Sequence, residues 1–383
     1  MADTQTSYLR TLYTDPVSKN ARAIFEQGDW HFEPHPALAN FIWMRNAYQP
    51  LIRKLRTDQM LNHIPNEQAI YDKGHLTRHL QVFDKLKKGQ DLALGQFFPE
   101  TYCLYRKEDC RAFLEKIPAK DTPDNLWILK PTQESRGIGI QILWQLGKLK
   151  ERLLYPGRKI PDLAMDPSRR YVIQRYIKNP LLLHGYKSEI RLYWLVACFD
   201  PLLVLIYKEG TVRRNASLFR LADFDNPLVH LTNIYQQIKH HPDPESLVLK
   251  WTFAQLQRYL TSDLKRAETD FVERELKPHW KKILSFVVFS ALKTLRRKPD
   301  RGFFWGLYGA DLILDSDLRS WLTEVQFCPG LSHIDIVKKE VIPGMMCEAA
   351  EIVLEVQQRK RTGRSLAQLE AVNGFEWVIN EAS

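Results

Sequence analysis

Long apolar runs are missing from this sequence of 383 residues, although 44% of its residues are hydrophobic. A membrane-spanning helix needs about 20 consecutive apolar residues. The longest run, Leu192–Leu205, is interrupted by Asp200 and Pro201. The first residues lack a basic region followed by an apolar stretch, so we expect no signal peptide. We therefore expect a cytoplasmic protein that has no membrane partner.

Cysteine is scarce and irregularly placed. The five cysteines are odd in number and show no Cys-x-x-Cys spacing, which argues against a disulfide framework and against a zinc site. Internal repeats and low-complexity tracts are also absent from the sequence. No recognition motif for DNA or RNA accompanies the basic residues, so we expect no nucleic-acid partner.

The net charge of +10 favours an acidic partner, which by charge alone could be a polypeptide, a nucleic acid or a membrane surface. The basic residues are spread along the chain, with small clusters at Lys85–Lys88, Arg296–Lys298 and Arg359–Arg364. Such a cluster is usually part of a solvated surface, and we prefer that interpretation for each. The length allows two or three sub-domains around a shared core, and we expect a monomer.

The stretch Tyr308–Pro329 predicts a β-hairpin, because two apolar runs flank a polar turn at Asp315–Ser320. We expect Asp317 and Leu318 to form a two-residue tip. Antiparallel pairing from that tip places two carboxylates, those of residues 311 and 324, directly opposite each other.

Gln326 shares the strand face of Glu324, so the hairpin brings three oxygen-bearing side chains to one patch with Asp311. Carboxylates within apolar strands are unfavourable unless a cation or a hydrogen-bond donor compensates them. Mg²⁺ is the best-fitting metal, since it prefers one or two protein carboxylates and completes its octahedron with water and nucleotide phosphate. Structural salt bridges of Asp311 and Glu324 with lysine or arginine are the alternative, and the hairpin alone does not distinguish the two.

A glycine-containing loop follows the buried-strand pattern Leu126–Pro131, which ends near Lys130. The loop, Arg136–Ile140, contains Gly137 and Gly139, whose amides can lie against phosphate oxygens while the lysine supplies positive charge. A strand is predicted to follow this loop, where a Rossmann or Walker motif requires a helix. The order excludes both motifs and suggests a flap that folds over a nucleotide.

Hydrophobic spacing predicts the other main elements. Helices are expected over Val17–Gln27, Gln68–Leu86, Glu108–Lys116, Phe253–Tyr259, Phe271–Leu295 and Gly344–Arg359, and strands over Gly139–Trp144, Arg170–Ile177, Leu192–Phe199 and Leu202–Lys208.

Several motifs occur in the order found in tubulin–tyrosine ligase and the tubulin–tyrosine-ligase-like proteins. The sequence therefore resembles that family from about Asn62 to Pro329. The motifs are Asn62–Pro65, Lys73, Phe97–Tyr102, Lys130, Gly137–Gly139, Gln174–Ile177, Lys187–Arg191, Tyr207–Arg213, His230–Asn233 and the hairpin with Asp311, Glu324 and Gln326.

The resemblance implies an α+β protein with an ATP-grasp fold, in which two lobes clamp ATP, and a smaller N-terminal α/β domain. The expected division is an N-terminal segment 1–60 that docks the target, an N-terminal α/β domain 61–124, a central lobe 125–178, a C-terminal lobe 179–360 with the magnesium site, and a tail 361–383.

The resemblance also implies a role for each matching residue. Two lysines would reach the phosphates beneath the flap, the segment 174–177 would read adenine, and Lys187 with Glu189 would hold the ribose. The implied ATP-binding set is Lys73, Lys130, Arg136, Gly137, Gly139, Gln174, Arg175, Tyr176, Ile177, Lys187, Glu189, Thr232 and Asn233. The implied magnesium ligands are Asp311, Glu324 and Gln326, and the implied catalytic residues are Arg191, Arg213 and Glu324.

The implied activity is that of an ATP-dependent carboxylate–amine ligase, with ATP and Mg²⁺ as cofactors. Transfer of the γ-phosphoryl group turns a carboxylate into an acyl phosphate, whose leaving group is good, and the amine of a free amino acid then attacks. The acceptor would be an acidic protein tail, with tubulin as one candidate, which suits the net charge of +10.

Three positions depart from the family pattern: Gln326 stands in place of asparagine, Arg175 in place of lysine and Glu189 in place of aspartate. One alternative is a catalytically impaired, ligase-derived protein that binds an acidic tail, and Gln326 favours it. Another is a ligase for a non-tubulin protein, a peptide or a small molecule. The sequence specifies neither the amino acid that is added nor whether the acceptor carboxylate belongs to the main chain or a side chain.

Overall fold

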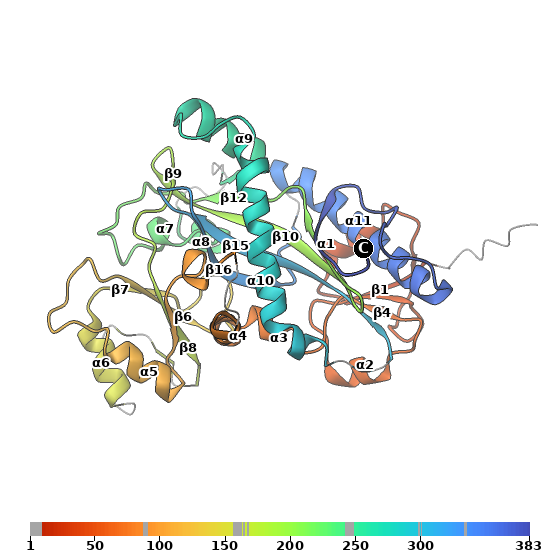
Figure 1. The fold of residues 1–383 in the computed structure, drawn as a ribbon, viewed down its shortest axis with the longest axis horizontal. Helices are drawn as coiled ribbons and strands as arrows, with labels where there is room; N and C mark the ends of the chain where they lie inside the picture. The colour runs from red at the N-terminus through yellow and green to blue at the C-terminus, as the bar shows by residue number, and fades with distance from the viewer. Residues whose placement is uncertain are drawn as a thin grey trace, which may run out of the picture.

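The computed structural model describes residues 10–86, 91–155, 163, 165–166, 168–241, 249–297, 299, 301–332 and 335–383. Three β-sheets with helices packed against them make an α+β protein, as predicted (Figure 1). Within these described ranges, no helix is both long enough and apolar enough to cross a membrane.

The elements before residue 180 form most of the two outer parts of the molecule. The helices are α1 (Lys19–Phe25), α2 (Gln49–Lys54), α3 (Gln68–Tyr71), α4 (Lys73–Leu86), the short 3₁₀ helix η1 (Leu94–Gln96), α5 (Lys107–Leu114) and α6 (Leu146–Leu154). The strands are β1 (Thr11–Thr14), β2 (His31–Phe32), β3 (Phe41–Trp43), β4 (Met60–Leu61), β5 (Thr101–Cys103), β6 (Trp127–Pro131), β7 (Gln141–Leu143) and β8 (Tyr171–Arg175). Helices α3 and α4, unlike the other elements of this half, lie near the centre of the molecule (Figure 1).

The elements after residue 180 form most of the centre. The helices are α7 (Pro227–His230), α8 (Ile234–His240), α9 (Phe253–Arg258), the π-helical turns η2 (Tyr259–Asp263) and η3 (Val272–Leu276), α10 (Lys277–Leu295) and α11 (Ile336–Thr362). The strands are β9 (Leu182–Leu183), β10 (Tyr186–Phe199), β11 (Leu202–Tyr207), β12 (Thr211–Arg214), β13 (Lys250–Trp251), β14 (Phe303–Phe304), β15 (Gly306–Leu314), β16 (Ser320–Phe327) and β17 (Phe375–Asn380).

The central sheet has eight strands and is built around β10, which pairs with β9, β11, β12 and β15. Helix α10 crosses one face of this sheet and α11 covers part of the other (Figure 1). Leu192 and Trp194 belong to the hydrophobic cluster on the α10 side, whereas Leu195 and Ala197 belong to the cluster that includes α11. A strand that is buried on both faces needs a continuous apolar run, which explains the sequence of this half of β10.

The first half of β10 has a different character on the α11 side. Successive side chains on that face are Lys187, Glu189 and Arg191, and the apolar part of the face begins only beyond them. All three side chains are buried, so each charge requires a partner inside the protein. The polar half of β10 therefore marks the place where a site is built.

The two smaller sheets lie on opposite sides of the central sheet (Figure 1). One has the order β5-β8-β6-β7, so it joins strands from both sides of the domain boundary that we expect at Thr122–Asn125. The other has the order β14-β4-β3-β1-β2 and joins the N-terminal strands to Phe303–Phe304. The segment 361–383, expected to be a tail, contains β17, which pairs with β11.

The helix predicted over Gln68–Leu86 is divided into α3 and α4 at Asp72, whose backbone is extended (φ −67°, ψ 120°). Its Oδ1 accepts hydrogen bonds from the backbone nitrogens of Gly74 and His75, both at 2.9 Å. An aspartate in this position satisfies amides of the first turn of a helix. The break places Lys73 at the very start of α4, where its side chain reaches the central sheet.

Candidate active site

The predicted hairpin is present, and Asp311 on β15 lies opposite Glu324 on β16 as the sequence predicts. The predicted two-residue tip is wrong. The backbone nitrogen of Asp315 donates to the carbonyl of Arg319 at 3.0 Å, so three residues form the tip. The last of them, Leu318, has a positive φ of 63°.

A β-bulge restores the predicted pairing. The register shifts between Asp311 and Leu312, which leaves Thr323 as an extra residue of β16. The Thr323 hydroxyl lies 2.9 Å from Glu189 Oε1 and 3.1 Å from the carbonyl oxygen of Asp311. The extra residue thus ties the hairpin to β10 as well as correcting its register.

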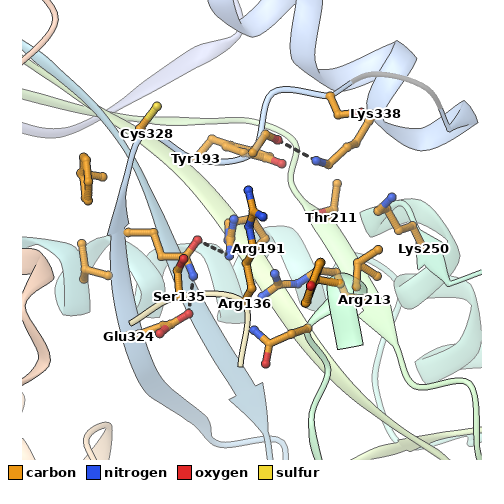
Figure 2. A pocket seen from close by; sticks show the side chains of 18 of the residues that line it. Ser135, Arg136, Arg191, Tyr193, Thr211, Arg213, Lys250, Glu324, Cys328 and Lys338 are labelled. Atoms are coloured by element: carbon orange, nitrogen blue, oxygen red, sulfur yellow. Dashed lines mark hydrogen bonds between the residues drawn. The ribbon is translucent and has the colours of Figure 1, made fainter. Parts of the chain in front are cut away.

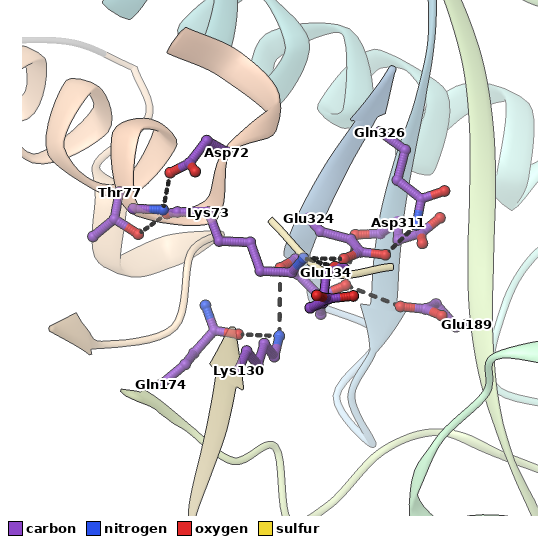
Figure 3. Close-up of polar contacts among 12 residues, drawn as sticks. Asp72, Lys73, Thr77, Lys130, Glu134, Gln174, Glu189, Asp311, Glu324 and Gln326 are labelled. Carbon is purple, nitrogen blue, oxygen red and sulfur yellow. Dashed lines mark hydrogen bonds and ion pairs between the residues drawn. The ribbon is translucent and has the colours of Figure 1, made fainter. Parts of the chain in front are cut away.

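Four neighbouring strands present one row of charged side chains. Arg213 on β12 lies opposite Glu189 on β10, and Arg191 on β10 lies opposite Asp311 on β15, which in turn pairs with Glu324 on β16. Because residues that are two apart share a face of a strand, the sheet geometry brings these side chains together. Figure 3 shows the hairpin part of this row with Glu189 beside it.

Asp311 is fully buried and is shared by two guanidinium groups. Arg191 Nη2 donates to Asp311 Oδ2 at 2.7 Å, Arg191 Nε contacts Oδ1, and Arg213 Nη2 lies 2.8 Å from Oδ2. Burial alone would raise the pKa of Asp311, but the two arginines outweigh it and hold that pKa well below its usual value. Asp311 is therefore ionised, and the salt-bridge alternative describes its contacts in this structure.

Gln326 links two members of the row. Its Oε1 accepts a hydrogen bond from Arg191 Nη2 at 2.8 Å, and its Nε2 donates to Glu324 Oε1. Arg213 Nη2 donates to Glu189 Oε2 at 2.8 Å, and the Thr232 hydroxyl donates to the same oxygen. Glu324 and Glu189 thus each accept a hydrogen bond from a neighbouring side chain of the site.

Two lysines from other elements approach the hairpin (Figure 3). Lys73 Nζ lies 3.2 Å from Glu324 Oε2 and donates to the carbonyl oxygen of Glu134 at 2.9 Å. Lys130 Nζ donates to Gln174 Oε1 at 2.8 Å, and burial lowers the pKa of Lys130 to about 8. Because burial disfavours the charged form of Lys130, a nearby anion would stabilise that form.

A third lysine lies in a buried layer beside this row. Lys187 Nζ donates to Tyr176 Oη and to the carbonyl oxygen of His230, both at 2.9 Å. Burial lowers the pKa of Lys187 to about 7, although Glu189 opposes the shift. Burial and the nearby Lys187 lower the pKa of His230 to about 4, so this imidazole is neutral.

The glycine loop is held against α8. Gln236 Nε2 donates to the carbonyl oxygen of Arg136 at 2.8 Å. Gly137 and Gly139 have positive φ values of 73° and 71°, and a Cβ on Gly137 would lie 2.8 Å from Asn233 Oδ1. Both positions therefore require glycine. Strand β7 follows the loop, as the sequence predicts.

A cavity of about 840 Å³ opens beside the charged row (Figure 2). Among the described residues that line it, seven are basic and three are carboxylates, so its walls are positively charged. The residues of the implied site that line this cavity are Lys73, Arg136, Arg191, Arg213, Asn233, Glu324 and Gln326.

A second cavity, of about 590 Å³, is lined by Arg175, Tyr176 and Ile177 of the implied adenine-binding segment. The Arg175 guanidinium donates to Asn125 Oδ1 at 2.6 Å and to Glu100 Oε2 at 3.0 Å, and it lies over the Trp127 ring. Arg175, Tyr176 and Ile177 thus line a different cavity from Lys73 and Arg136, whereas Gln174 of the same segment contacts Lys130. Six further residues of the implied site are buried and line neither cavity: Lys130, Gln174, Lys187, Glu189, Thr232 and Asp311.

Among the residues of the larger cavity that the predicted site does not include are Tyr193, Thr211, Lys250 and Lys338. The first two continue the alternation of the charged row along β10 and β12, and that alternation could have identified them. Lys250 and Lys338 belong to no motif, and only the folded chain brings them to the site.

The donor set fits a hard cation. Asp311, Glu324 and Gln326 offer two carboxylates and one amide oxygen, the ligand types that Mg²⁺ prefers. Glu324 and Gln326 line the cavity, whereas both oxygens of Asp311 contact guanidinium groups. No group of three His, Cys, Asp or Glu side chains suited to a metal occurs in the described part of the chain, so other ligands would have to come from water or phosphate.

The fold and the lining of this cavity define an α+β protein with a positively charged cavity beside its central sheet. A model of the tubulin-tyrosine ligase family matches residues 52–362, so the chain belongs to that family.

Among known relatives, protein polyglycylase TTLL10 of Rattus norvegicus is 28% identical over 84% of this chain and 49% of its own length. Inactive polyglycylase TTLL10 of Homo sapiens is 31% identical over 77% of this chain and 44% of its own. Probable tubulin polyglutamylase TTLL2 of Homo sapiens is 31% identical over 76% of this chain and 46% of its own. The chain thus spans about half the length of these relatives.

Proposed function

We propose that this chain is an ATP-dependent amino-acid ligase with an ATP-grasp fold, which joins a free amino acid to a carboxylate of an acidic protein tail in the cytoplasm. The observation that carries the proposal is the row of Arg213, Glu189, Arg191, Asp311 and Glu324 across four strands, with Lys73 and Lys130 above it. Tubulin is the first candidate for the acceptor, since relatives are named as tubulin polyglutamylases.

ATP with Mg²⁺ would supply the activation of the acceptor carboxylate as an acyl phosphate, the kind of group that an amine can displace. Asp311, Glu324 and Gln326 would hold the metal. Lys73 and Lys130 would balance phosphate charge.

The two arginines would orient the reacting carboxylate, because a guanidinium fork meets carboxylate and phosphate oxygens in pairs. Arg191 and Arg213 are already fixed by Asp311, so they need no rearrangement to present their remaining donors to the cavity. Charge that develops on a reacting oxygen would be stabilised by such fixed donors. The glycine loop at Gly137–Gly139 would cover the phosphates and exclude water.

The test is phosphate release from ATP and Mg²⁺ in the presence of amino acids and acidic peptide tails, comparing the wild type with Glu324→Gln. We expect the wild type to release phosphate only when an amino acid and a tail are both present. We expect Glu324→Gln to release it on the order of 100-fold more slowly, as for other losses of a charge-stabilising group. Glu340→Gln, at an exposed position of α11, is the matched control and should behave as wild type.

A ligase-derived binding protein without turnover is the second candidate. It is favoured by Gln326, whose amide oxygen accepts from Arg191 and whose nitrogen donates to Glu324. One relative is itself named an inactive polyglycylase. Saturable binding of ATP and an acidic peptide, with no phosphate released for any pair of substrates, would support this candidate against the first.

A further inference from the structure

The larger cavity has a corner that the proposed phosphate and metal chemistry does not use. Tyr193, Thr211, Lys250 and Lys338 line this corner, and in Figure 2 Lys338 and Lys250 lie across the cavity from Glu324. We call these four residues the lysine corner. They come from β10, β12, β13 and α11, so the corner depends on the completed fold.

Apart from a contact between the hydroxyls of Tyr193 and Thr211, three buried polar atoms in or beside the lysine corner have no hydrogen-bond partner in the described part of the chain. They are Tyr193 Oη, Thr211 Oγ1 and Arg213 Nε. Tyr193 and Thr211 are both 0% exposed. Buried donors without a partner are unfavourable, and three beside one cavity offer a polar ligand several groups to bind.

The charge of the corner indicates the sign of that ligand. Lys250 is neutralised by an ion pair with Asp335, whose other oxygen accepts from the backbone nitrogen of Lys338 at 3.0 Å. Lys338 Nζ donates to the carbonyl oxygen of Gly330 at 2.6 Å, and no carboxylate among the described residues forms an ion pair with it. Burial, then Lys250 and Arg191, lower the pKa of Lys338 to about 7. An anion placed here would compensate Lys338 and accept from the hydroxyls.

We propose that Lys338, together with the hydroxyls of Tyr193 and Thr211, binds one carboxylate of the amino-acid substrate and selects a dicarboxylic amino acid such as glutamate over glycine. This inference rests on the proposed ligase function. Glutamate can place its side-chain carboxylate by Lys338 while its α-carboxylate accepts from donors of the arginine pair that Asp311 and Glu189 leave open to the cavity. Glycine has a single carboxylate and can occupy only one of these two places. The cavity of about 840 Å³ has room for the longer amino acid.

Membership of the family does not settle this choice, since relatives are named both as polyglycylases and as polyglutamylases. The same chemistry could be supplied by a glutamate of the acceptor tail. We assign the corner to the free amino acid because Tyr193 and Thr211 are at 0% exposure, so that a small molecule has easier access to their hydroxyls than a polypeptide chain.

The experiment measures binding of L-glutamate, L-glutamine and glycine to the full chain, by calorimetry with Mg²⁺ and a non-hydrolysable ATP analogue present. We expect the wild type to bind glutamate at least about 10-fold more tightly than glycine or glutamine, which corresponds to about 1.4 kcal/mol. Lys338→Gln should reduce the glutamate-to-glycine affinity ratio by about 10-fold. Thr211→Val, which keeps the shape and removes the hydroxyl, should weaken glutamate binding in the same direction.

Lys339→Gln is the matched control, because this neighbouring lysine is exposed and does not line the cavity. It should keep the wild-type ratio. The inference is overturned if the wild type binds glycine as tightly as glutamate, or if Lys338→Gln keeps the wild-type ratio. It is also overturned if the variant weakens only an acidic peptide added in place of free glutamate.

The two proposals fail in different ways. Phosphate release with glycine and a tail, but not with glutamate, would retain the ligase and reject the glutamate subsite. Glutamate binding that depends on Lys338, with no phosphate released for any tail, would retain the subsite and reject the ligase.

Discussion

Arg191 and Asp311 lie directly opposite each other on two antiparallel strands, and the guanidinium contacts both carboxylate oxygens, with Nη2 to Oδ2 at 2.7 Å. Arg213 approaches the same carboxylate from the next strand at 2.8 Å. Both arginines are at least nine-tenths buried, so their orientation is fixed by the protein rather than by a ligand. The ion pairs of Asp311 with Arg191 and Arg213 therefore hold three strands of the central sheet together and also fix the charged groups of the candidate site.

Substitution of Asp311 by asparagine should destabilise the protein strongly. The change leaves two buried guanidinium groups without their shared carboxylate, and breaking a buried pair from one side typically costs about 3–5 kcal/mol. Urea unfolding measures this difference. Asp317→Asn, at an exposed position in the hairpin turn, should change stability by less than about 0.5 kcal/mol. A value for Asp311→Asn as small as that of the control would show that the arginines have other compensation.

The imidazole of His63 should make stability depend on pH. Its Nδ1 lies 2.6 Å from Glu67 Oε1 and its Nε2 lies 2.8 Å from the carbonyl oxygen of Met44, so both nitrogens face acceptors. Burial opposes the charged form, but Glu67 and the carbonyl outweigh it and raise the pKa of His63. Because the folded pKa is the higher one, the contribution is fully present below the unfolded value of about 6.5 and is lost as pH rises through the folded pKa.

Unfolding free energies at several pH values from about 5.5 upward test this dependence in the wild type and in His63→Gln. The difference between the two proteins should shrink as the pH rises. His35→Gln, at an exposed histidine, is the control and should show no such trend. A constant difference for His63→Gln over the whole range would mean that the pKa of His63 is the same in the folded and the unfolded protein.

Alanine at position 137 should weaken nucleotide binding if the glycine loop covers phosphate. Gly137 has a φ of 73°, and the added Cβ would meet Asn233 Oδ1 at 2.8 Å and Gln236 Cγ at 3.0 Å. The loop would then have to move away from α8. We expect ATP affinity to fall about 10-fold or more, measured by calorimetry, since a left-handed non-glycine residue alone costs about 1–2 kcal/mol. Gly147→Ala, in α6 with its nearest contact at 3.5 Å, should bind ATP as the wild type does.

The hairpin shows which structural features a local sequence pattern can predict and which it cannot. Alternation and the polar turn predicted the pairing of Asp311 with Glu324, and the pairing is present. The predicted tip was wrong because Leu318 takes a left-handed conformation and Thr323 forms a bulge, two deviations that cancel in the register. A bulge depends on cross-strand contacts, here those of the Thr323 hydroxyl with Glu189, which the local pattern does not contain.

The sequence patterns did not predict which strands from distant parts of the chain pair with each other. Phe303–Phe304 joins the N-terminal sheet through β4, and Phe375–Asn380 joins the central sheet through β11, although neither segment has a distinctive motif. The helix predicted to begin at Gly344 begins at Ile336, with Pro343 inside it, because Asp335 caps the earlier turn. These features are decided by contacts between distant segments, and the lysine corner has the same origin.

Replacing Gln326 by asparagine should lower the Mg²⁺ concentration that the proposed ligase reaction requires. The glutamine is long enough to accept from Arg191 at 2.8 Å and to donate to Glu324 at the same time. Asparagine is one methylene shorter, so it should release one of these contacts and free an oxygen for the cation. Phosphate release as a function of Mg²⁺ concentration should then reach half of its maximum at a several-fold lower concentration than in the wild type.

The control for this change is Gln358→Asn, at an exposed position near the end of α11, which should leave the Mg²⁺ curve unchanged. A higher Mg²⁺ requirement in Gln326→Asn would mean that the contact with Arg191 orders the site, so that glutamine is the better residue here. An unchanged curve would exclude Gln326 from the metal environment. In that case Asp311 and Glu324 alone would supply the protein ligands, which agrees with the one or two carboxylates that Mg²⁺ prefers.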